Sequence, residues 1–347
     1  MTQTRKAVCL ISGGLDSMLA AKVVMEQGVH VEGINFYTGF CVEGHTHAIR
    51  AKDKAKPKRN NSLWVAEQLG IKPHIIDIVE PYKDIVLNPK HGYGANLNPC
   101  LDCKIFMVGQ AKAWMEENGF DFIITGEVIG QRPMSQRKAT MPVIAEKSTA
   151  EDRLLRPLCA QNLPETLPER EGWVQREQLL GITGRSRHQQ IELAERYGFT
   201  DYAQPAGGCC FLTHKEYSFK LQDLWKSRGE RAYEPDDIML LKVGRHIRPK
   251  PYFKLIVARE EGENHFLSGY RKQFDSLHCT SHVGPVVLVD GTLTPQDYTL
   301  AAQIVARFSQ GKQADEVTVE LKRRDGEVVT LPVKPFAAED VKREWYL

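Results

Sequence analysis

The chain has 347 residues and a formal net charge of +2, a length that suits two domains better than one. A nearly balanced charge excludes a global basic field for nucleic acid, so any RNA site has to be a local patch. No apolar run approaches the roughly 18 residues that span a membrane, and the first strand starts too early for a signal peptide. We therefore expect a cytoplasmic protein with no membrane partner, whose eight cysteines are thiols or metal ligands rather than a disulfide framework.

The first predicted elements are a strand, a glycine turn and a helix. Ala7–Ile11 is apolar, residues 12–17 are Ser-Gly-Gly-Leu-Asp-Ser, and residues 18–24 have helical spacing. Such a junction forms an anion site, because free N–H groups and the helix dipole converge there. Two glycines permit close approach of a phosphate, and two serines add hydroxyl donors. No Gly-Lys-Ser/Thr follows, so the loop is not of the Walker type. An ordinary strand–helix turn is the alternative.

The region up to about residue 158 alternates strand and helix. The predicted strands are 31–36, 74–78 and 120–126, and the predicted helices are 61–69 and 105–117. This alternation predicts an α/β fold with a doubly wound parallel sheet, whose ligand site lies at the carboxyl ends of the strands.

A basic segment, 45–59, interrupts this alternation. We interpret it either as a solvated loop or as a phosphate-contacting flap for RNA.

Cysteines form the second strong pattern. Cys100 and Cys103 have the Cys-x-x-Cys spacing that places two thiolates on one metal or cluster. Either Cys209 or Cys210 supplies a third thiol. Three thiols suit a [4Fe–4S] cluster with one open iron; a structural zinc, a catalytic dithiol that alternates between persulfide and disulfide, and unrelated buried thiols are the alternatives. Cys9 lies in the first predicted strand and is assigned to packing. No companion is evident for Cys41, Cys159 and Cys279.

A second domain is predicted, so that the chain divides into residues 1–214 and 215–347. The segment 162–172 is an irregular connection, and 185–197 is a predicted helix. Beyond it we expect helices 217–228 and 294–308 and strands 238–243, 252–258, 286–289 and 316–322. This mixture predicts a small α+β domain.

The motifs together resemble the tRNA thiouridine synthases of the ATP pyrophosphatase (PP-loop) family over residues 5–213. Ser-Gly-Gly-Leu-Asp-Ser matches the family's pyrophosphate loop, Thr125-Gly-Glu with Gly130-Gln is similar to 4-thiouridine synthases, and Asn98-Pro-Cys with Cys210-Phe is similar to 2-thiouridine synthases. The C-terminal strings Val243-Gly-Arg-His, Phe253-Lys-Leu, Ala301-Ala, Phe308-Ser and Val317-Thr-Val resemble the RNA-binding domain of NFACT ribosome-quality-control proteins. We expect that domain to replace the usual RNA-docking module, for which no room precedes the loop.

The resemblance implies ATP-dependent thiolation of a tRNA uridine, with 4-thiouridine as the preferred product. AMP is attached to a uracil carbonyl oxygen and sulfur then displaces it. ATP, with Mg²⁺, is expected to contact Ser12, Gly13, Gly14, Asp16, Ser17, Phe36, Thr125, Gly126 and Gln131. Asp16 is catalytic, orienting the loop or helping to hold Mg²⁺; its non-catalytic alternative is capping the helix.

For sulfur, the resemblance implies a cluster on Cys100, Cys103 and Cys210. In the dithiol version Cys210 carries a persulfide and Cys100 resolves it. The donor is sulfide or a cysteine desulfurase.

Five basic residues are predicted to contact tRNA: Arg132, Arg137, Arg245, Lys250 and Lys254. Alternate residues of a strand share a face, so Lys250, Tyr252 and Lys254 are expected to form one RNA-facing stripe. A charged solvent face is the alternative.

Two other functions are compatible with these patterns. One is a ligase of the same superfamily that forms an amide or nitrile with ammonia, and the other is a non-catalytic RNA-binding protein with a relic loop. The intact loop argues against a relic. The sequence leaves open the ring position and the oligomeric state, a homodimer included.

Overall fold

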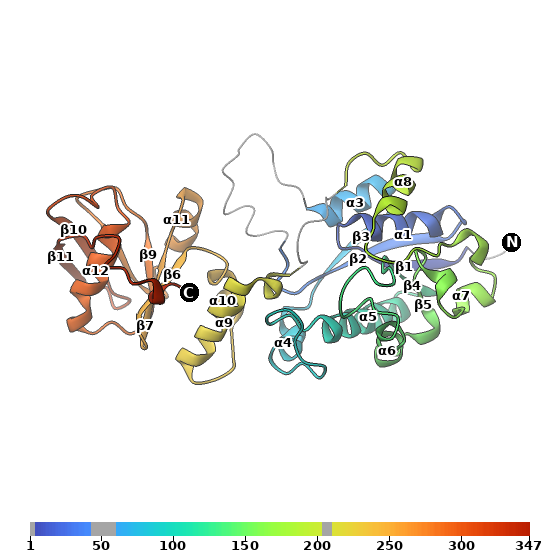
Figure 1. The fold of residues 1–347 in the computed structure, drawn as a ribbon, viewed down its shortest axis with the longest axis horizontal. Helices are drawn as coiled ribbons and strands as arrows, with labels where there is room; N and C mark the ends of the chain where they lie inside the picture. Colours follow the sequence, from blue (N-terminus) through green and yellow to red (C-terminus); the bar gives the residue numbers. More distant parts are fainter. Residues whose placement is uncertain (1–3, 43–59, 203–209) are drawn as a thin grey trace. The chain divides into compact units, whose positions relative to one another are not determined.

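The computed structural model describes residues 4–42, 60–202 and 210–347 (Figure 1). The described residues form two compact units, the first ending at Thr213 and the second running from His214 to Leu347. In this part of the chain no helix is both long enough and apolar enough to cross a membrane.

The first unit is built on a parallel sheet covered by helices on both faces (Figure 1). Helices α1, α3 and α8 lie on one face, and α4, α5 and α6 on the other. The doubly wound α/β prediction is thereby confirmed. The strand order is β3-β2-β1-β4-β5, with β1 (Lys6–Leu10), β2 (His30–Tyr37), β3 (Pro73–Asp77), β4 (Phe122–Thr125) and β5 (Leu154–Leu155). The helices are α1 (Leu15–Met25), α3 (Asn61–Leu69), α4 (Val79–Leu87), α5 (Cys100–Glu117), α6 (Thr140–Lys147), α7 (Leu167–Arg170) and α8 (His188–Arg196).

The strand order reverses direction at β1. Strands β2 and β3 extend the sheet on one side of β1, whereas β4 and β5 extend it on the other. In open α/β sheets ligands bind at the carboxyl ends of the strands next to such a switch point. The segments that meet there are residues 11–14 after β1 and residues 126–131 after β4.

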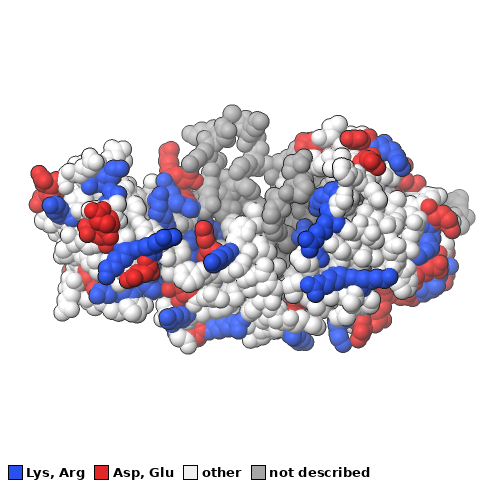
Figure 2. All heavy atoms as spheres, viewed as in Figure 1, with Lys and Arg blue, Asp and Glu red and all other residues white. Residues whose placement is uncertain are grey.

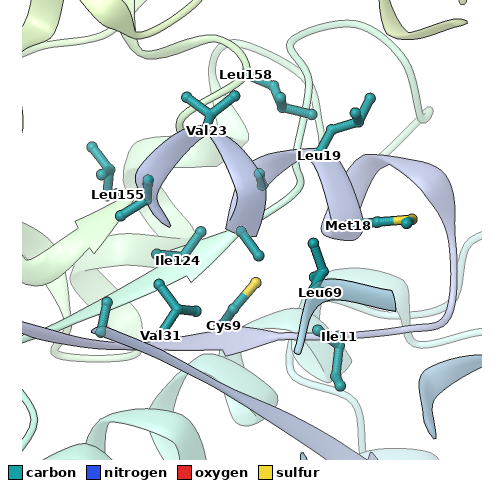
Figure 3. Close-up of a cluster of buried hydrophobic side chains, with 14 of the residues drawn as sticks. Cys9, Ile11, Met18, Leu19, Val23, Val31, Leu69, Ile124, Leu155 and Leu158 are labelled. Atoms are coloured by element: carbon teal, nitrogen blue, oxygen red, sulfur yellow. The ribbon is translucent and has the colours of Figure 1, made fainter. Parts of the chain in front are cut away.

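Helix α1 is the centre of the first unit's core. Its residues Met18, Leu19 and Val23 belong to one buried cluster with the strand residues Cys9 and Ile124, and Leu19 and Val23 lie beside Leu158 on the side of α1 away from the strands (Figure 3). Nearly every position of α1 is buried, because its sequence is apolar on all sides. Burial raises the pKa of the Cys9 thiol to about 12, which fits the packing role predicted for this cysteine.

The second unit is an antiparallel sheet with helices. Strand order is β11-β10-β8-β9-β7-β6, and α12 packs Ala301, Ile304 and Val305 into the core of the sheet. This arrangement confirms the α+β prediction. The strands are β6 (Arg245–Lys250), β7 (Phe253–Val257), β8 (Asp275–Cys279), β9 (Val287–Gly291), β10 (Val317–Lys322) and β11 (Val328–Val333). The helices are α9 (Lys215–Arg228), α10 (Pro235–Leu240), α11 (Glu261–Ser268) and α12 (Tyr298–Arg307).

One predicted strand of the second unit was wrong. Residues 238–243 were expected to be a strand, but helix α10 occupies 235–240. Pro235 at the start of the helix and a capping box between Glu234 and Asp237 initiate it. These helix-start signals outweigh the short apolar run that predicted a strand.

Candidate functional site

The Ser-Gly-Gly loop at the end of β1 is preformed around an open helix N-terminus. Gly14 is the N-cap of α1, and no described side chain caps it, so the first N–H groups of the helix are available to an anion. Ser17 Oγ donates to the Gly14 carbonyl at 2.8 Å and accepts from the Ser12 N–H at 3.4 Å. Since Gly14 holds the N-cap, Asp16 does not have the capping role considered for it.

Two glycines let other segments pack tightly against this loop. Gly13 has φ +76°, and a Cβ added to it would lie 2.6 Å from Asn61 Cβ at the start of α3. At the end of β4, a Cβ on Gly126 would lie 2.5 Å from backbone atoms of Asp16 and Ser17. No L side chain fits either position without displacing the loop. Gly126, which is predicted to contact ATP, therefore packs directly against the backbone of the Ser-Gly-Gly loop.

Asp16 is the centre of a polar network around the loop. Gln131 Nε2 donates to Asp16 Oδ2 at 2.6 Å, and Arg187 Nη2 lies 3.2 Å from the same oxygen. Gln190, fully buried on α8, donates to Gln131 Oε1 at 2.9 Å. The other carboxylate oxygen, Asp16 Oδ1, is buried and has no hydrogen-bond partner in the described structure. A buried acceptor of this kind suits a cation or a hydroxyl group of a ligand.

Sequence reasoning found Gln131 but missed Arg187 and Gln190. The only sequence signal for them was the polar start of the helix predicted at 185–197. Nothing in a single sequence indicates that this helix packs beside α1. Two further residues predicted to bind nucleotide, Phe36 and Thr125, are buried, with 6% and 1% of their surface exposed.

Below the loop lies a buried ion pair. Arg156 Nε is 3.1 Å from Glu127 Oε2, which also accepts a hydrogen bond from Thr125 Oγ1 at 2.8 Å. Burial acts to raise the pKa of Glu127, but nearby Lys104 and Arg156, with the hydrogen bonds, hold it below its ordinary value. Thr125 therefore connects the end of β4 to this pair, and Glu127 is ionised at neutral pH.

The Cys-x-x-Cys pair lies in the first turn of helix α5. Cys100 Sγ is 3.4 Å from Ser135 Oγ, in the same loop as Gln131. The segment 131–137 thus connects the nucleotide loop to the cysteine pair. Asp102, between the two cysteines, accepts from the His91 N–H at 2.9 Å and lies 2.8 Å from His91 Nδ1. Its role is to anchor the chain segment that precedes α5.

Cys210 lies on a short segment that contacts two other segments of the first unit, one at Cys41 and one at Asn96. It forms an isolated antiparallel bridge with Cys41, and the Phe211 N–H donates to the Phe40 carbonyl at 2.8 Å. Asn96 Nδ2 donates to the Thr213 carbonyl at 2.7 Å, so the same segment also contacts the loop before α5. The prediction that Cys41 has no companion was wrong, because its partner is remote in sequence. Cys209 lies outside the described residues.

The three predicted metal ligands do not converge. Within residues 4–42, 60–202 and 210–347, no three His, Cys, Asp or Glu side chains lie close enough to hold a metal ion. Cys100, Cys103 and Cys210 therefore do not fit a [4Fe–4S] cluster or a zinc ion in this structure.

The basic residues predicted to contact RNA differ in exposure. Arg132 and Arg137, in the 131–137 loop, are exposed and have no acidic partner in the described part of the chain. In the second unit Arg245 and Lys250 are exposed as well. Lysines and arginines are interspersed with acidic side chains over the face seen in Figure 2, as the balanced net charge implies.

Lys254 does not belong to an RNA-facing stripe. Only 1% of its side chain is exposed, and its Nζ lies 3.1 Å from Asp290 and 3.8 Å from Asp223. The stripe prediction was wrong because β6 ends at Lys250 and β7 begins at Phe253. A hairpin turn therefore separates residues that were assumed to alternate along one strand.

A cavity of about 690 Å³ adjoins Arg245 in the second unit. Arg245 lies over the ring of Phe308, 5.5 Å from its centroid. Neither Arg245 nor the other lining cations Arg307 and Lys312 has an acidic partner among the described residues. Arg259 also lines the cavity, but it is paired with Glu263. Three cations without an acidic partner among the described residues, together with an aromatic ring, therefore line this cavity.

Comparison with known proteins places both units. Residues 5–156 match the family model of the tRNA methyl transferase HUP domain, and residues 244–346 match that of the NFACT protein RNA binding domain. The first unit is therefore similar to this HUP domain, and because it carries the Ser-Gly-Gly loop we call it the PP-loop domain below. The match to this PP-loop domain includes the nucleotide loop, Cys100 and Cys103, whereas Arg187 and Cys210 lie beyond it. The NFACT-type domain includes Arg245 and the cavity.

Relatives of the PP-loop domain are tRNA-modifying enzymes by name. The tRNA-specific 2-thiouridylase MnmA of Campylobacter curvus is 30% identical over 128 residues, which are 36% of this chain and 35% of that protein. MnmA of Pseudomonas fluorescens is 23% identical over 253 residues, 71% of this chain and 61% of that protein. A solved 4-thiouridine synthetase–RNA complex with bound ATP aligns with a TM-score of 0.40 and 20% identity, covering 69% of this chain and 50% of that chain. The chain spans about a third of the length of the first of these relatives.

Proposed function

We propose that this protein thiolates a uridine in tRNA with ATP as the activating substrate. AMP is transferred to a uracil carbonyl oxygen, pyrophosphate is released, and sulfur displaces AMP. The observation that carries the proposal is the open N-terminus of α1 at the switch point of a PP-loop domain. A uracil oxygen is a poor leaving group, and its attachment to AMP makes displacement by sulfur feasible.

The nucleotide loop supplies positive charge for this step. Backbone N–H groups of the turn and of the first turn of α1 bind the phosphates. Arg187, 3.2 Å from Asp16, adds a cation at the same place. The free Oδ1 of Asp16 is a hard oxygen ligand that fits Mg²⁺, which offsets phosphate charge when bound.

For sulfur delivery we propose a cysteine persulfide on Cys210. It forms when the Cys210 thiolate attacks the outer sulfur of a persulfide on a cysteine desulfurase, whose own cysteine leaves as a thiolate. A cluster or zinc ion is left out of the proposal, because the described thiols do not converge on one point. Iron and zinc analysis of anaerobically purified protein tests this choice. One iron–sulfur cluster per chain, lost in Cys100→Ser, would contradict it.

For tRNA binding we propose two sets of exposed cations. Arg132 and Arg137 contact RNA near the nucleotide loop, and Arg245 and Lys250 do so in the NFACT-type domain. The cavity beside Phe308 takes an unpaired nucleotide, since an unpaired base can stack on an aromatic ring whereas a base inside a duplex cannot.

The ring position is part of the proposal. The string Thr125-Gly-Glu with Gly130-Gln favours 4-thiouridine, while the named relatives of the PP-loop domain are 2-thiouridylases. The ammonia-dependent ligase and the non-catalytic RNA-binding protein have no observation of their own in their favour.

Mass spectrometry of tRNA nucleosides tests the proposed function. We expect a strain that lacks the gene to lose one thiouridine, and we expect the wild-type gene to restore it. Asp16→Asn should fail to restore it, whereas Cys279→Ser, in the other domain, should succeed as a control. Both 4-thiouridine and 2-thiouridine are measured. If the two nucleosides are unchanged in the deletion strain, the proposed function is wrong.

A further inference from the structure

Cys41 and Cys210 oppose each other across two chain segments. They are partners in an isolated antiparallel bridge, and the Phe211 N–H donates to the Phe40 carbonyl at 2.8 Å. This bond joins the neighbours of the two cysteines, so Cys41 and Cys210 form a non-hydrogen-bonded pair, in which Cα atoms are about 4.5 Å apart. Disulfides need a Cα separation of about 4.4–6.8 Å. The backbone already meets that requirement.

Cys41 and Cys210 are each partly exposed and are not in a disulfide. The Leu212 N–H donates to Cys210 Sγ at 3.4 Å. Burial raises the pKa of Cys9 to about 12 and that of Cys159 to about 11, so those two thiols stay protonated and unreactive.

We propose that Cys41 is the thiol that resolves a persulfide carried by Cys210. The Cys41 thiolate attacks Cys210 Sγ, a disulfide bond forms between the two cysteines, and the terminal sulfur leaves as hydrosulfide with the bonding electron pair. Hydrosulfide then attacks the adenylated carbon and AMP leaves. A dithiol reductant supplies two electrons and two protons and returns both cysteines to thiols.

This proposal rests on the proposed function only for the use of the sulfur. It gives Cys41 the resolving role that the sequence pattern had assigned to Cys100. Cys100 lies at the start of α5, and its thiol is 3.4 Å from Ser135 Oγ.

The test uses full-length protein loaded with persulfide by sodium polysulfide, desalted, and kept without ATP and tRNA. We expect the wild type to release sulfide and to form a disulfide between the peptides that contain Cys41 and Cys210. Cys41→Ser should keep its persulfide and release no sulfide. Cys279→Ser, which removes another partly exposed thiol, should behave as the wild type. A thermal unfolding midpoint equal to that of the wild type shows that Cys41→Ser is folded.

A disulfide between Cys210 and Cys100, with sulfide release unchanged in Cys41→Ser, would overturn the proposal. The two proposals fail in different ways. If the protein forms the Cys41–Cys210 disulfide but does not thiolate tRNA, the proposed function is wrong and the role of the cysteine pair stands. Thiolation of tRNA by persulfide-loaded Cys41→Ser without added reductant removes the resolving role and keeps the proposed function.

Discussion

The nucleotide loop and the cysteine region of the PP-loop domain are built in opposite ways. Six consecutive residues form the loop, and its neighbours Asn61 and Gly126 only pack against a turn that is already specified. The cysteines come from three remote segments, namely the segment after β2, the start of α5 and the turn at Cys210. A site made by one turn is determined by local sequence, whereas a site made by remote segments depends on the whole fold.

The largest effect is expected from filling the space beside the nucleotide loop. In Gly126→Val the new side chain collides with the backbone of Asp16 and Ser17, which lies 2.5 Å from the Cβ position. We expect ATP-dependent activity to fall by about 100-fold or more, because displacement of reacting groups by ~1 Å has that cost. Initial rates and ATP titrations measure the effect.

Gly109→Ala in α5 is the matched control for this change. An added Cβ there meets nothing closer than 3.8 Å, so activity should be retained. Full activity of Gly126→Val would show that the loop is less fixed than its packing indicates.

The next effect concerns the ion pair that supports the loop. Glu127→Gln leaves Arg156 buried without a counter-charge, which should cost about 3–5 kcal/mol in the free energy of unfolding. The exposed pair of Asp152 and Arg170 is the control, and Asp152→Asn should cost less than about 1 kcal/mol. Urea unfolding at pH 7 separates the two cases.

The ion pair also predicts a dependence on pH. The pKa of Glu127 is lowered in the folded state from an ordinary value of 4.5, so its stabilisation is complete above that value. It is lost as the pH falls through the lower folded pKa. The difference between wild type and Glu127→Gln should therefore shrink as the pH falls below 4.5. A constant difference from pH 7 to pH 3 would contradict this account.

The smallest effect is expected at the surface of the NFACT-type domain. Removing Arg245 and Lys250 should reduce the log–log salt slope of tRNA binding by roughly two units, because each of these cations is expected to neutralise one phosphate. Lys254→Ala should leave the slope unchanged and lower the stability of the domain, because Lys254 is buried beside Asp290. Filter binding from low to moderate salt gives the slopes. If the salt slope of tRNA binding changed only in Lys254→Ala, Lys254 and not Arg245 or Lys250 would be the phosphate contact.

Local sequence predicted the architecture and the nucleotide loop because both depend on short-range patterns. Strand–helix alternation predicted the doubly wound sheet, and the Ser-Gly-Gly string predicted the turn between β1 and α1. The failures involve remote partners or overlooked turns. Arg187 reaches Asp16 only because α8 packs beside α1, and Cys41 meets Cys210 only in the folded chain. The predicted stripe around Lys254 was wrong because a two-residue hairpin turn separates Lys250 from Phe253, and the basic residues on both sides of it gave no signal for a turn.

The most direct test of the central claim is the fate of ATP in the presence of tRNA. We predict that the purified protein cleaves ATP to AMP and pyrophosphate, that tRNA stimulates the cleavage, and that Asp16→Asn abolishes it. Cys41→Ser should still release pyrophosphate in the adenylation step. Radiolabelled ATP separated by thin-layer chromatography distinguishes the products. Formation of ADP and phosphate, or cleavage indifferent to tRNA, would contradict the claim that this loop activates a tRNA base.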